Sequence, residues 1–101
     1  MNELDLAKLA GFQWDDGNAR KNDKHQVSTA ESEQVFFNTP LLVLADAKHS
    51  DREPRLHALG RTDRDRLLHI AFTLRESGRK IRVISARDMH RKERTIYDQA
   101  D

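Results

Sequence analysis

The feature that most restricts the fold of this chain is the stretch 80–97, in which an alternating segment runs directly into a basic, amphipathic one. Residues 81–86, IRVISA, are apolar or β-branched at four positions and contain no strand-breaking residue, which predicts a strand. Side chains alternate between the two faces of a strand. We therefore expect one face to carry Ile81, Val83 and Ser85, and the other to carry Arg82, Ile84 and Ala86.

The polar residues of this stretch are informative, because a purely structural strand does not need them. The strand carries Arg82, Ser85 and Arg87, and the helix predicted after it adds Arg91, Arg94 and Tyr97. Between positions 79 and 94 the sequence has seven Lys or Arg residues against two acidic residues. Such a local excess of positive charge favours a phosphate group or an acidic protein as the partner.

The overall composition sets broader limits. A chain of 101 residues is long enough for one core, so we expect a single domain over residues 1–101, with residues 1–11 as an N-terminal arm. Lys and Arg total 18 against 17 for Asp and Glu, so the net charge of +1 produces no strong overall field. Cysteine is absent, which excludes disulfides, thiol nucleophiles and cysteine-bound metals.

No targeting segment is visible in the sequence. The longest apolar run, LLVLA at 41–45, is far shorter than the roughly 20 residues that span a bilayer. The first residues include two acids instead of the basic head of a signal peptide. We therefore expect a protein of the reducing cytoplasm.

The first half of the chain predicts one short strand and two helices. Residues 12–15, FQWD, predict a strand that buries Phe12 and Trp14 in the core. A turn and a first helix follow over residues 15–25. Ser28 or Thr29, with Glu31 shortly after, forms a capping-box pattern that predicts the start of the second helix. That helix should end before Pro40.

The second half predicts four strands and the last helix. The strands cover residues 41–46, 55–60, 66–75 and 81–86, with a polar loop at 47–54. In the longest strand we expect Leu68, Ile70, Phe72 and Leu74 to face the core, and Leu67, His69, Ala71 and Thr73 to lie opposite. This order of elements predicts an α+β domain, with an antiparallel sheet and helices packed on one of its faces.

Several classes of site have no support in the sequence. The five histidines, at positions 25, 49, 57, 69 and 90, never have the HxxxH or HxH spacing that brings two imidazoles to one metal. His57 and His69 lie on strands expected to pair, and we interpret them as neighbours that face solvent. The four glycines are isolated, so no phosphate-binding loop is predicted. We expect neither a metal nor a cofactor.

Basic residues from separate elements give a better signal. They come from the first helix, from two strands and from the last helix: Lys24, His25, Arg55, Arg61, Arg82, Arg87 and Arg91. A sheet face lined with such groups can hold a phosphodiester and stabilise charge in the transition state. RNA can be cleaved without metal by attack of its own 2′-OH, given a base, an acid and cations. The residues able to exchange protons are His25, Glu93 and Tyr97.

The order of motifs resembles the BrnT family of bacterial toxins over about residues 12 to 98. The resemblance rests on FQWD, DGNxxKN, KH, VFFNTPLLVLAD, KHSDREPR, ALGRTDR, RLLHIAFTLR and, most specifically, IRVISAR followed by RKERxxY. It implies a RelE-like ribonuclease fold and cleavage of RNA that arrests translation. It also implies a BrnA-type antitoxin with a ribbon-helix-helix DNA-binding part, which represses the operon together with the toxin.

Our first hypothesis is therefore a toxin that acts as a metal-independent endoribonuclease. Arg55, Arg82 and Arg87 are its expected phosphate clamps, His25 and Tyr97 are candidates for proton transfer, and Glu93 is a weaker candidate for the base. Further RNA contacts are expected from Lys24, Arg61, Arg91 and Arg94. Two alternatives stay open: a non-catalytic module that binds nucleic acid or protein through the same basic face, and a structural domain whose arginines pair with surface acids.

Overall fold

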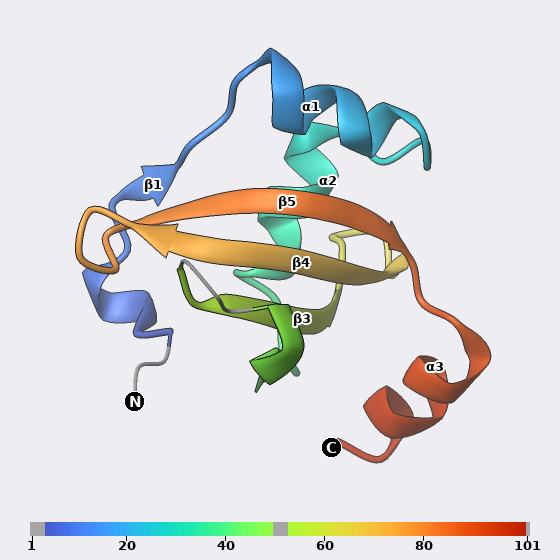
Figure 1. Cartoon of the computed structure of the whole chain (residues 1–101). Helices are drawn as coiled ribbons and strands as arrows, with labels where there is room; N and C mark the ends of the chain where they lie inside the picture. Colours follow the sequence, from blue (N-terminus) through green and yellow to red (C-terminus); the bar gives the residue numbers. More distant parts are fainter. Residues whose placement is uncertain (1–3, 50–52, 101) are drawn as a thin grey trace.

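The computed structural model describes residues 4–49 and 53–100 (Figure 1). Its strands are β1 (Gly11–Phe12), β2 (Leu42–Ala45), β3 (Arg55–Arg61), β4 (Leu67–Arg75) and β5 (Lys80–Asp88). Its α-helices are α1 (Asp16–Asp23), α2 (Thr29–Val35) and α3 (Arg91–Asp98). Two 3₁₀ turns complete the order, η1 (Leu6–Lys8) and η2 (Ala47–His49). No helix in the described part of the chain combines the length and apolar character needed to cross a membrane.

The five strands form one mixed sheet in the order β1-β5-β4-β3-β2. β2, β3, β4 and β5 pair in antiparallel fashion, whereas β1 runs parallel to β5 and places Phe12 beside Ile81. The expectation of an α+β domain is confirmed, but the expectation of a purely antiparallel sheet is wrong. β1 lies at the edge of the sheet beside β5, although the two strands lie far apart in the sequence. No hairpin turn joins them, so β1 is not forced to run antiparallel to β5.

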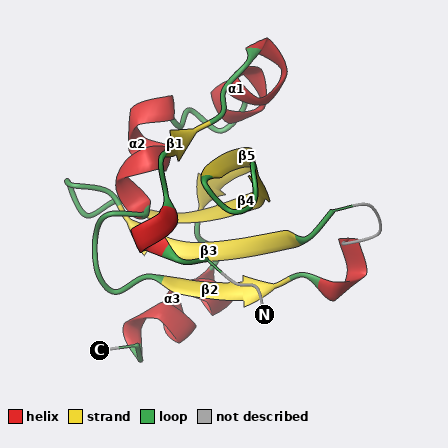
Figure 2. Cartoon of the chain, turned by 90° about the vertical axis from the view of Figure 1, so that its left-hand side faces the viewer, coloured by secondary structure: helices red, strands yellow, loops and turns green. Residues whose placement is uncertain are grey.

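One face of the sheet is covered by α2 and forms the main core. Leu68, Ile70 and Phe72 of β4 are fully buried on this face, as predicted, and Leu74 packs against them. Phe36, just after α2, meets Phe72 edge to face with ring centroids 5.1 Å apart. α1 lies on the same side of the sheet (Figure 2). The capping box that starts α2 is confirmed, because Ser28 and Glu31 exchange side-chain to backbone hydrogen bonds.

The helix α3 lies across the opposite face, so the expectation that all helices gather on one face is wrong. Tyr97 of α3 and Met89, just before it, pack against Leu59 in a second cluster, which Leu42 and Leu67 complete. Leu59 follows Ala58 of the main core directly, and neighbouring residues of a strand point to opposite faces. The apolar residues on this second face require a cover, and α3 supplies it.

A bulge in β5 changes the alternation that the sequence suggests. Ala71 pairs with Ser85, but Phe72 pairs with Val83, so Ile84 is the extra residue. Ala86 is therefore fully buried on the core face with Val83, and Ser85 lies on the second face. The expected grouping of Ser85 with Ile81 and of Ala86 with Arg82 is wrong, because the inserted residue shifts the period by one.

The remaining differences concern the ends of elements. The strand expected at 12–15 is only the two-residue β1, although Phe12 and Trp14 do pack against the core. The loop expected at 47–54 contains η2, and its residues 50–52 lie outside the described residues. The same holds for residues 1–3 of the expected arm, while η1 occupies its centre.

Asn18 ties α1 to the sheet. Its side chain is 4% exposed and donates to the carbonyl oxygens of Gln13 and Val83, both at 3.0 Å. Its own amide oxygen accepts from the backbone N–H of Asp15 at 2.7 Å. The first helix is thus held in place by one buried amide.

Replacement Asn18→Ala leaves these three main-chain groups without their partner. We expect the free energy of unfolding, measured with urea, to fall by about 2–3 kcal/mol. Arg20→Ala, an exposed position on the same helix, is the control and should change it by less than about 0.5 kcal/mol. Equal stability of the two variants would show that Asn18 does not hold the helix.

Candidate functional site

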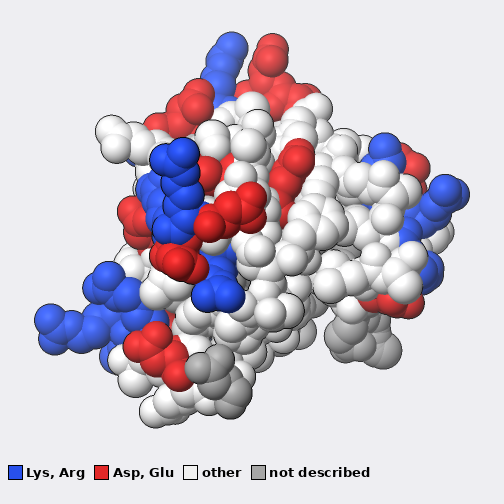
Figure 3. All heavy atoms as spheres, turned by 180° about the vertical axis from the view of Figure 1, so that it is seen from behind, with Lys and Arg blue, Asp and Glu red and all other residues white. Residues whose placement is uncertain are grey.

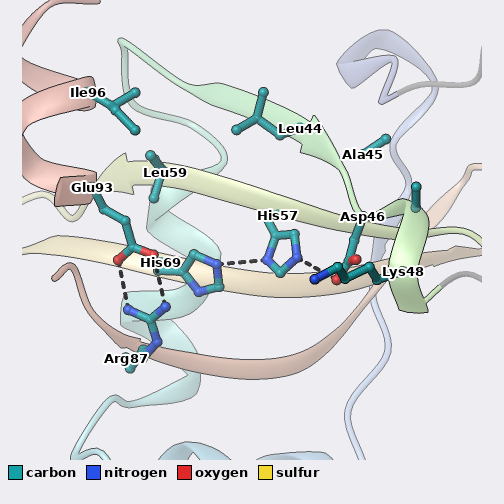
Figure 4. A pocket seen from close by; sticks show the side chains of 11 residues that line it. Leu44, Ala45, Asp46, Lys48, His57, Leu59, His69, Arg87, Glu93 and Ile96 are labelled. Atoms are coloured by element: carbon teal, nitrogen blue, oxygen red, sulfur yellow. Dashed lines mark hydrogen bonds and ion pairs between the residues drawn. The ribbon is translucent and has the colours of Figure 1, made fainter.

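A cleft of about 520 Å³ opens on the second face of the sheet, between α3 and η2 (Figure 4). The β3 and β4 strands form its floor, β2 and η2 form one wall, and α3 forms the other. The cleft is lined by Leu44, Ala45, Asp46, Ala47, Lys48, His57, Leu59, His69, Arg87, Glu93 and Ile96.

A chain of three hydrogen-bonded side chains crosses the floor of the cleft. His57 Nε2 lies 2.6 Å from Asp46 Oδ2, and His57 Nδ1 lies 2.7 Å from His69 Nε2. The strand register explains this contact: β3 pairs His57 with Ala71 and Leu59 with His69, so the two imidazoles are diagonal neighbours on one face. Figure 4 shows the three side chains in one line from η2 toward α3.

The hydrogen bonds also fix which ring nitrogens carry protons. An ionised carboxylate only accepts hydrogen bonds, so Asp46 requires a proton on His57 Nε2. In the neutral pair, His57 Nδ1 is then an acceptor, and His69 Nε2 must donate to it. His69 Nδ1 is left as a bare acceptor, and it has no hydrogen-bond partner among the described residues.

His69 is held in the neutral form. Its side chain lies in the middle strand of the sheet, and the residue is 8% exposed. Burial, followed by the positive charge of Arg87, lowers the pKa of its imidazole from 6.5 to about 4. At neutral pH this ring is therefore uncharged, and its Nδ1 is a buried acceptor that lacks a donor among the described residues.

An ion pair stands next to the two imidazoles. Arg87, directly across the strands from His69, donates two hydrogen bonds to the carboxylate of Glu93, at 2.8 and 2.9 Å. Glu93 also accepts from the backbone N–H of His90 and so caps the start of α3. The hydrogen bond from Arg87 is the main cause that lowers the pKa of Glu93 to about 2. This carboxylate is therefore ionised and firmly held.

Further groups surround the cleft. Lys48 on η2 is exposed at the mouth, and Arg55 Nε lies 3.8 Å from Asp46 Oδ2. Leu44 and Ile96 are about half exposed at the rim, at 55% and 50%. The cleft thus combines cations and imidazoles with apolar edges.

The structure brings together only part of the residues predicted from the sequence. Arg87 and Glu93 line the cleft, and Arg55 adjoins it through Asp46. Arg82 lies on the same face, across from Thr73 and Arg55, but it binds Asp15 at 2.9 Å. Each of these arginines therefore faces a carboxylate already.

The other predicted residues lie elsewhere. Tyr97 is 6% exposed, and its hydroxyl donates to the carbonyl oxygen of Pro40 at 2.6 Å, so it anchors α3. His25 is exposed in the turn after α1, outside the residues that line the cleft. The predicted RNA-binding residues are exposed, in the case of Lys24, Arg91 and Arg94, or half-buried, in the case of Arg61. Arg61 also pairs with Asp65.

Surface charge on the opposite side of the molecule forms no single basic area. Figure 3 shows acidic and basic side chains intermixed over the left half of this side and along its right edge, with an uncharged region between them. This pattern agrees with the net charge of +1.

Four polar residues of the cleft were not predicted as site residues from the sequence: Asp46, Lys48, His57 and His69. The period of two in β3 and β4 would have placed both histidines on the face opposite the core. It could not supply their register or the position of Asp46 beside them. The expectation that they face solvent is wrong for His69, which is buried.

The site has the groups needed for acid–base chemistry on a phosphate ester. Neutral imidazoles can accept a proton, and guanidinium and ammonium groups can stabilise the charge on a phosphate. Among residues 4–49 and 53–100, no group of three or more His, Asp or Glu side chains is placed to hold a metal ion. The proton-transfer chemistry of the cleft can be derived from its own side chains.

The chain matches a known protein family. Residues 14–93 match the model of the ribonuclease toxin BrnT of type II toxin–antitoxin systems. This range includes α1, α2, all strands from β2 to β5, and every residue that lines the cleft except Ile96. A comparison with individually curated proteins found no match.

The lowered pKa of His69 predicts a pH dependence of stability. Below pH 6.5 the unfolded chain binds a proton at His69, which the folded protein does not bind until about pH 4. The neutral His69 therefore contributes fully to the free energy of unfolding above pH 6.5, and this contribution is lost as the pH falls from 6.5 to about 4. We expect a loss of about 3 kcal/mol in the free energy of unfolding between pH 6.5 and about 4.

Urea unfolding at a series of pH values measures this loss. The variant His69→Asn should show a flatter pH dependence between 6.5 and 4, since it lacks the group. The Glu93 contribution is separable, because it is lost at lower pH, between 4.5 and about 2. The same slope in variant and parent would contradict the burial of a neutral His69.

Proposed function

The chain belongs to the BrnT family of ribonuclease toxins of type II toxin–antitoxin systems, and we propose that it is an endoribonuclease whose active site is the cleft between α3 and η2. The family implies RNA as the substrate and an antitoxin as the partner. The observation that carries the proposal is the meeting of two imidazoles and an arginine in one cleft on the second sheet face.

The proposed reaction needs no metal. The 2′-OH of the RNA attacks the neighbouring phosphorus, the bond to the 5′-oxygen breaks, and a 2′,3′-cyclic phosphate remains. The protein has to accept a proton from the 2′-OH and stabilise the negative charge of the phosphate. The histidine pair suits the first task, and the cations Arg87, Lys48 and Arg55 suit the second.

The residues around the cleft take secondary roles in this proposal. Exposed cations on α3, Arg91 and Arg94, extend the path of a bound strand, and Lys24 and Arg61 hold more distant phosphates. Tyr97 holds α3 against the sheet, because its hydroxyl donates a hydrogen bond to the carbonyl oxygen of Pro40. This assignment moves proton transfer from His25 and Tyr97 to the imidazoles in the cleft.

A second candidate function is binding without catalysis. It is favoured by one observation, that Arg55, Arg82 and Arg87 each lie against a carboxylate in the free protein. A phosphate would have to compete with these acids. Under this alternative the face binds an RNA backbone or the antitoxin, and the affinity for RNA falls steeply with salt while the RNA stays intact.

We further propose that the antitoxin is a BrnA-like protein with a ribbon-helix-helix DNA-binding part. Its acidic, partly helical segment would cover the cleft and leave the DNA-binding part exposed. Charge complementarity supports this, since burial of several cations requires counter-charges on the partner. The half-exposed Leu44 and Ile96 at the rim would add apolar contact.

Purified protein should cleave single-stranded RNA in the presence of EDTA and leave 2′,3′-cyclic phosphate ends. Arg87→Ala should lower kcat/KM by about 100-fold or more, because it removes a cation at the phosphate. Arg64→Ala replaces an exposed arginine in the turn after β3 and serves as the matched control. Gel analysis of an end-labelled RNA and mapping of its termini provide the readout.

Two outcomes would contradict the proposal. Cleavage that appears only after addition of a divalent metal would refute the mechanism. RNA that is bound but remains intact after long incubation would support the binding module instead. An equal loss in the Arg64 and Arg87 variants would show that the effect is general charge and not the cleft.

Charge reversal tests the proposed cover by the antitoxin. Arg87→Glu should weaken the toxin–antitoxin complex by a few kcal/mol and abolish RNA cleavage, because both partners use the same cation. Arg82→Glu should also weaken the toxin–antitoxin complex and RNA cleavage, because the acidic segment of the antitoxin is proposed to extend along the sheet. Isothermal titration with the antitoxin measures the affinity. Unchanged affinity in both variants, with cleavage lost, would separate the two surfaces.

A further inference from the structure

We infer that Asp46, His57 and His69 form a proton relay in which His69 Nδ1 is the atom that accepts the proton of the substrate 2′-OH. This inference rests on the proposed ribonuclease function and deepens it. His69 is the catalytic base of the relay, whereas His57 and Asp46 are positioning residues that act through it.

The inference depends on Nδ1 of His69, which has no hydrogen-bond partner among the described residues. Both ring nitrogens of His57 are already engaged, one by Asp46 and one by His69. Within the described residues, His69 Nδ1 is the one nitrogen of the two rings without a partner. The residue lines the cleft with 8% of its surface exposed, and Nδ1 itself is buried in the free protein. A buried acceptor without a donor costs free energy, and a substrate hydroxyl would satisfy it.

The proton then has a defined path. The 2′-OH gives its proton to His69 Nδ1, and the proton on His69 Nε2 moves to His57 Nδ1. His57 retains the proton on Nε2, so the new positive charge lies 2.6 Å from the Asp46 carboxylate. The 2′-oxygen bonds to phosphorus, and the 5′-oxygen leaves with the bonding pair and takes a proton from water.

A relay of two rings is needed because His69 alone is a poor base. Its pKa of about 4 means that it holds a proton weakly at neutral pH. Transfer to His57 moves the charge away from Arg87 and toward a carboxylate. Glu93 is a still weaker base, since its pKa is about 2.

Substrate access involves the ion pair beside the relay. The Arg87–Glu93 pair stands on the side of His69 away from His57 (Figure 4). The two parallel hydrogen bonds that Arg87 gives to Glu93 have the geometry with which arginine also binds phosphate. A substrate phosphate would take the place of Glu93 on Arg87 and bring its ribose to His69.

The charged and titratable groups that face the relay come from every wall of the cleft. They can all influence its pH dependence. Arg55 comes from β3, Lys48 from η2, Arg87 from β5, His90 from the position just before α3, and Glu93 from α3.

Kinetics of RNA cleavage in EDTA test the order of the relay. His69→Asn should lower kcat by about 100-fold or more with little change in KM. Asp46→Asn should lower kcat with little change in KM, because the positive charge that reaches His57 loses the carboxylate 2.6 Å away. Asp98→Asn, an exposed acid on α3 outside the cleft lining, is the matched control and should leave kcat and KM unchanged.

Glu93→Gln tests the competition for Arg87. Glutamine retains a side-chain oxygen to cap α3 but lacks the charge. We expect cleavage to persist with a several-fold lower KM for RNA. A loss of kcat equal to that of His69→Asn would make Glu93 the base and overturn the inference.

Nitrogen-15 NMR of the histidine rings provides a readout without activity or substitution. The relay requires that both His57 and His69 carry their proton on Nε2 in the free protein at neutral pH. A proton on His69 Nδ1 would overturn the inference, because no lone pair would then meet the 2′-OH.

The outcomes separate this inference from the proposed function. If the parent protein cleaves no RNA, the proposed function itself fails. If the parent cleaves RNA and His69→Asn keeps more than about a tenth of its kcat, the function stands and the relay is refuted. The same holds if His25→Asn, and not His69→Asn, abolishes cleavage.

Discussion

The contact between α2 and one face of the central strands determines where everything else in this protein lies. Phe36 and the buried residues of β4 form a continuous apolar layer, with Phe72 at its centre. Since side chains alternate along a strand, this layer forces the residues between them onto the second face. The positions of His57, His69 and Arg87 are thus a consequence of core packing in the strands that carry them.

The second face is only partly covered, and this is the origin of the cleft. Tyr97 seals the end of the sheet near Leu59 through apolar contact and a hydrogen bond to Pro40. Glu93, one turn earlier in α3, then reaches Arg87. The same short helix therefore closes a small core and forms one wall of the site. The register of β3 and β4 supplies the floor, where two imidazoles come within 2.7 Å of each other.

Much of the fold could be predicted from local patterns. The capping box at Ser28 and the alternation in β4 each express one physical rule within a few residues, and both are confirmed. The bulge at Ile84 could not be predicted, because it depends on how β5 pairs with β4. The side of the sheet that α3 covers could not be predicted either, since it depends on the contact of Tyr97 with Leu59 of β3, which is far away in the sequence.

The site was predictable to a smaller extent, for the same reason. Arg87 and Glu93 were found because they lie in one basic stretch, six residues apart. Asp46, His57 and His69 come from three separate segments, and no local spacing connects them. The resemblance to the BrnT family indicated the chemistry, whereas only the register of the strands shows which imidazoles meet.

The central claim is that the substrate supplies its own nucleophile and the cleft supplies the base. The most direct measurement uses an RNA with a single 2′-deoxy nucleotide on the 5′ side of a mapped cleavage position, incubated with the protein in EDTA. The account predicts that cleavage stops at that position and continues at unmodified ones. Continued cleavage at the modified position would contradict it.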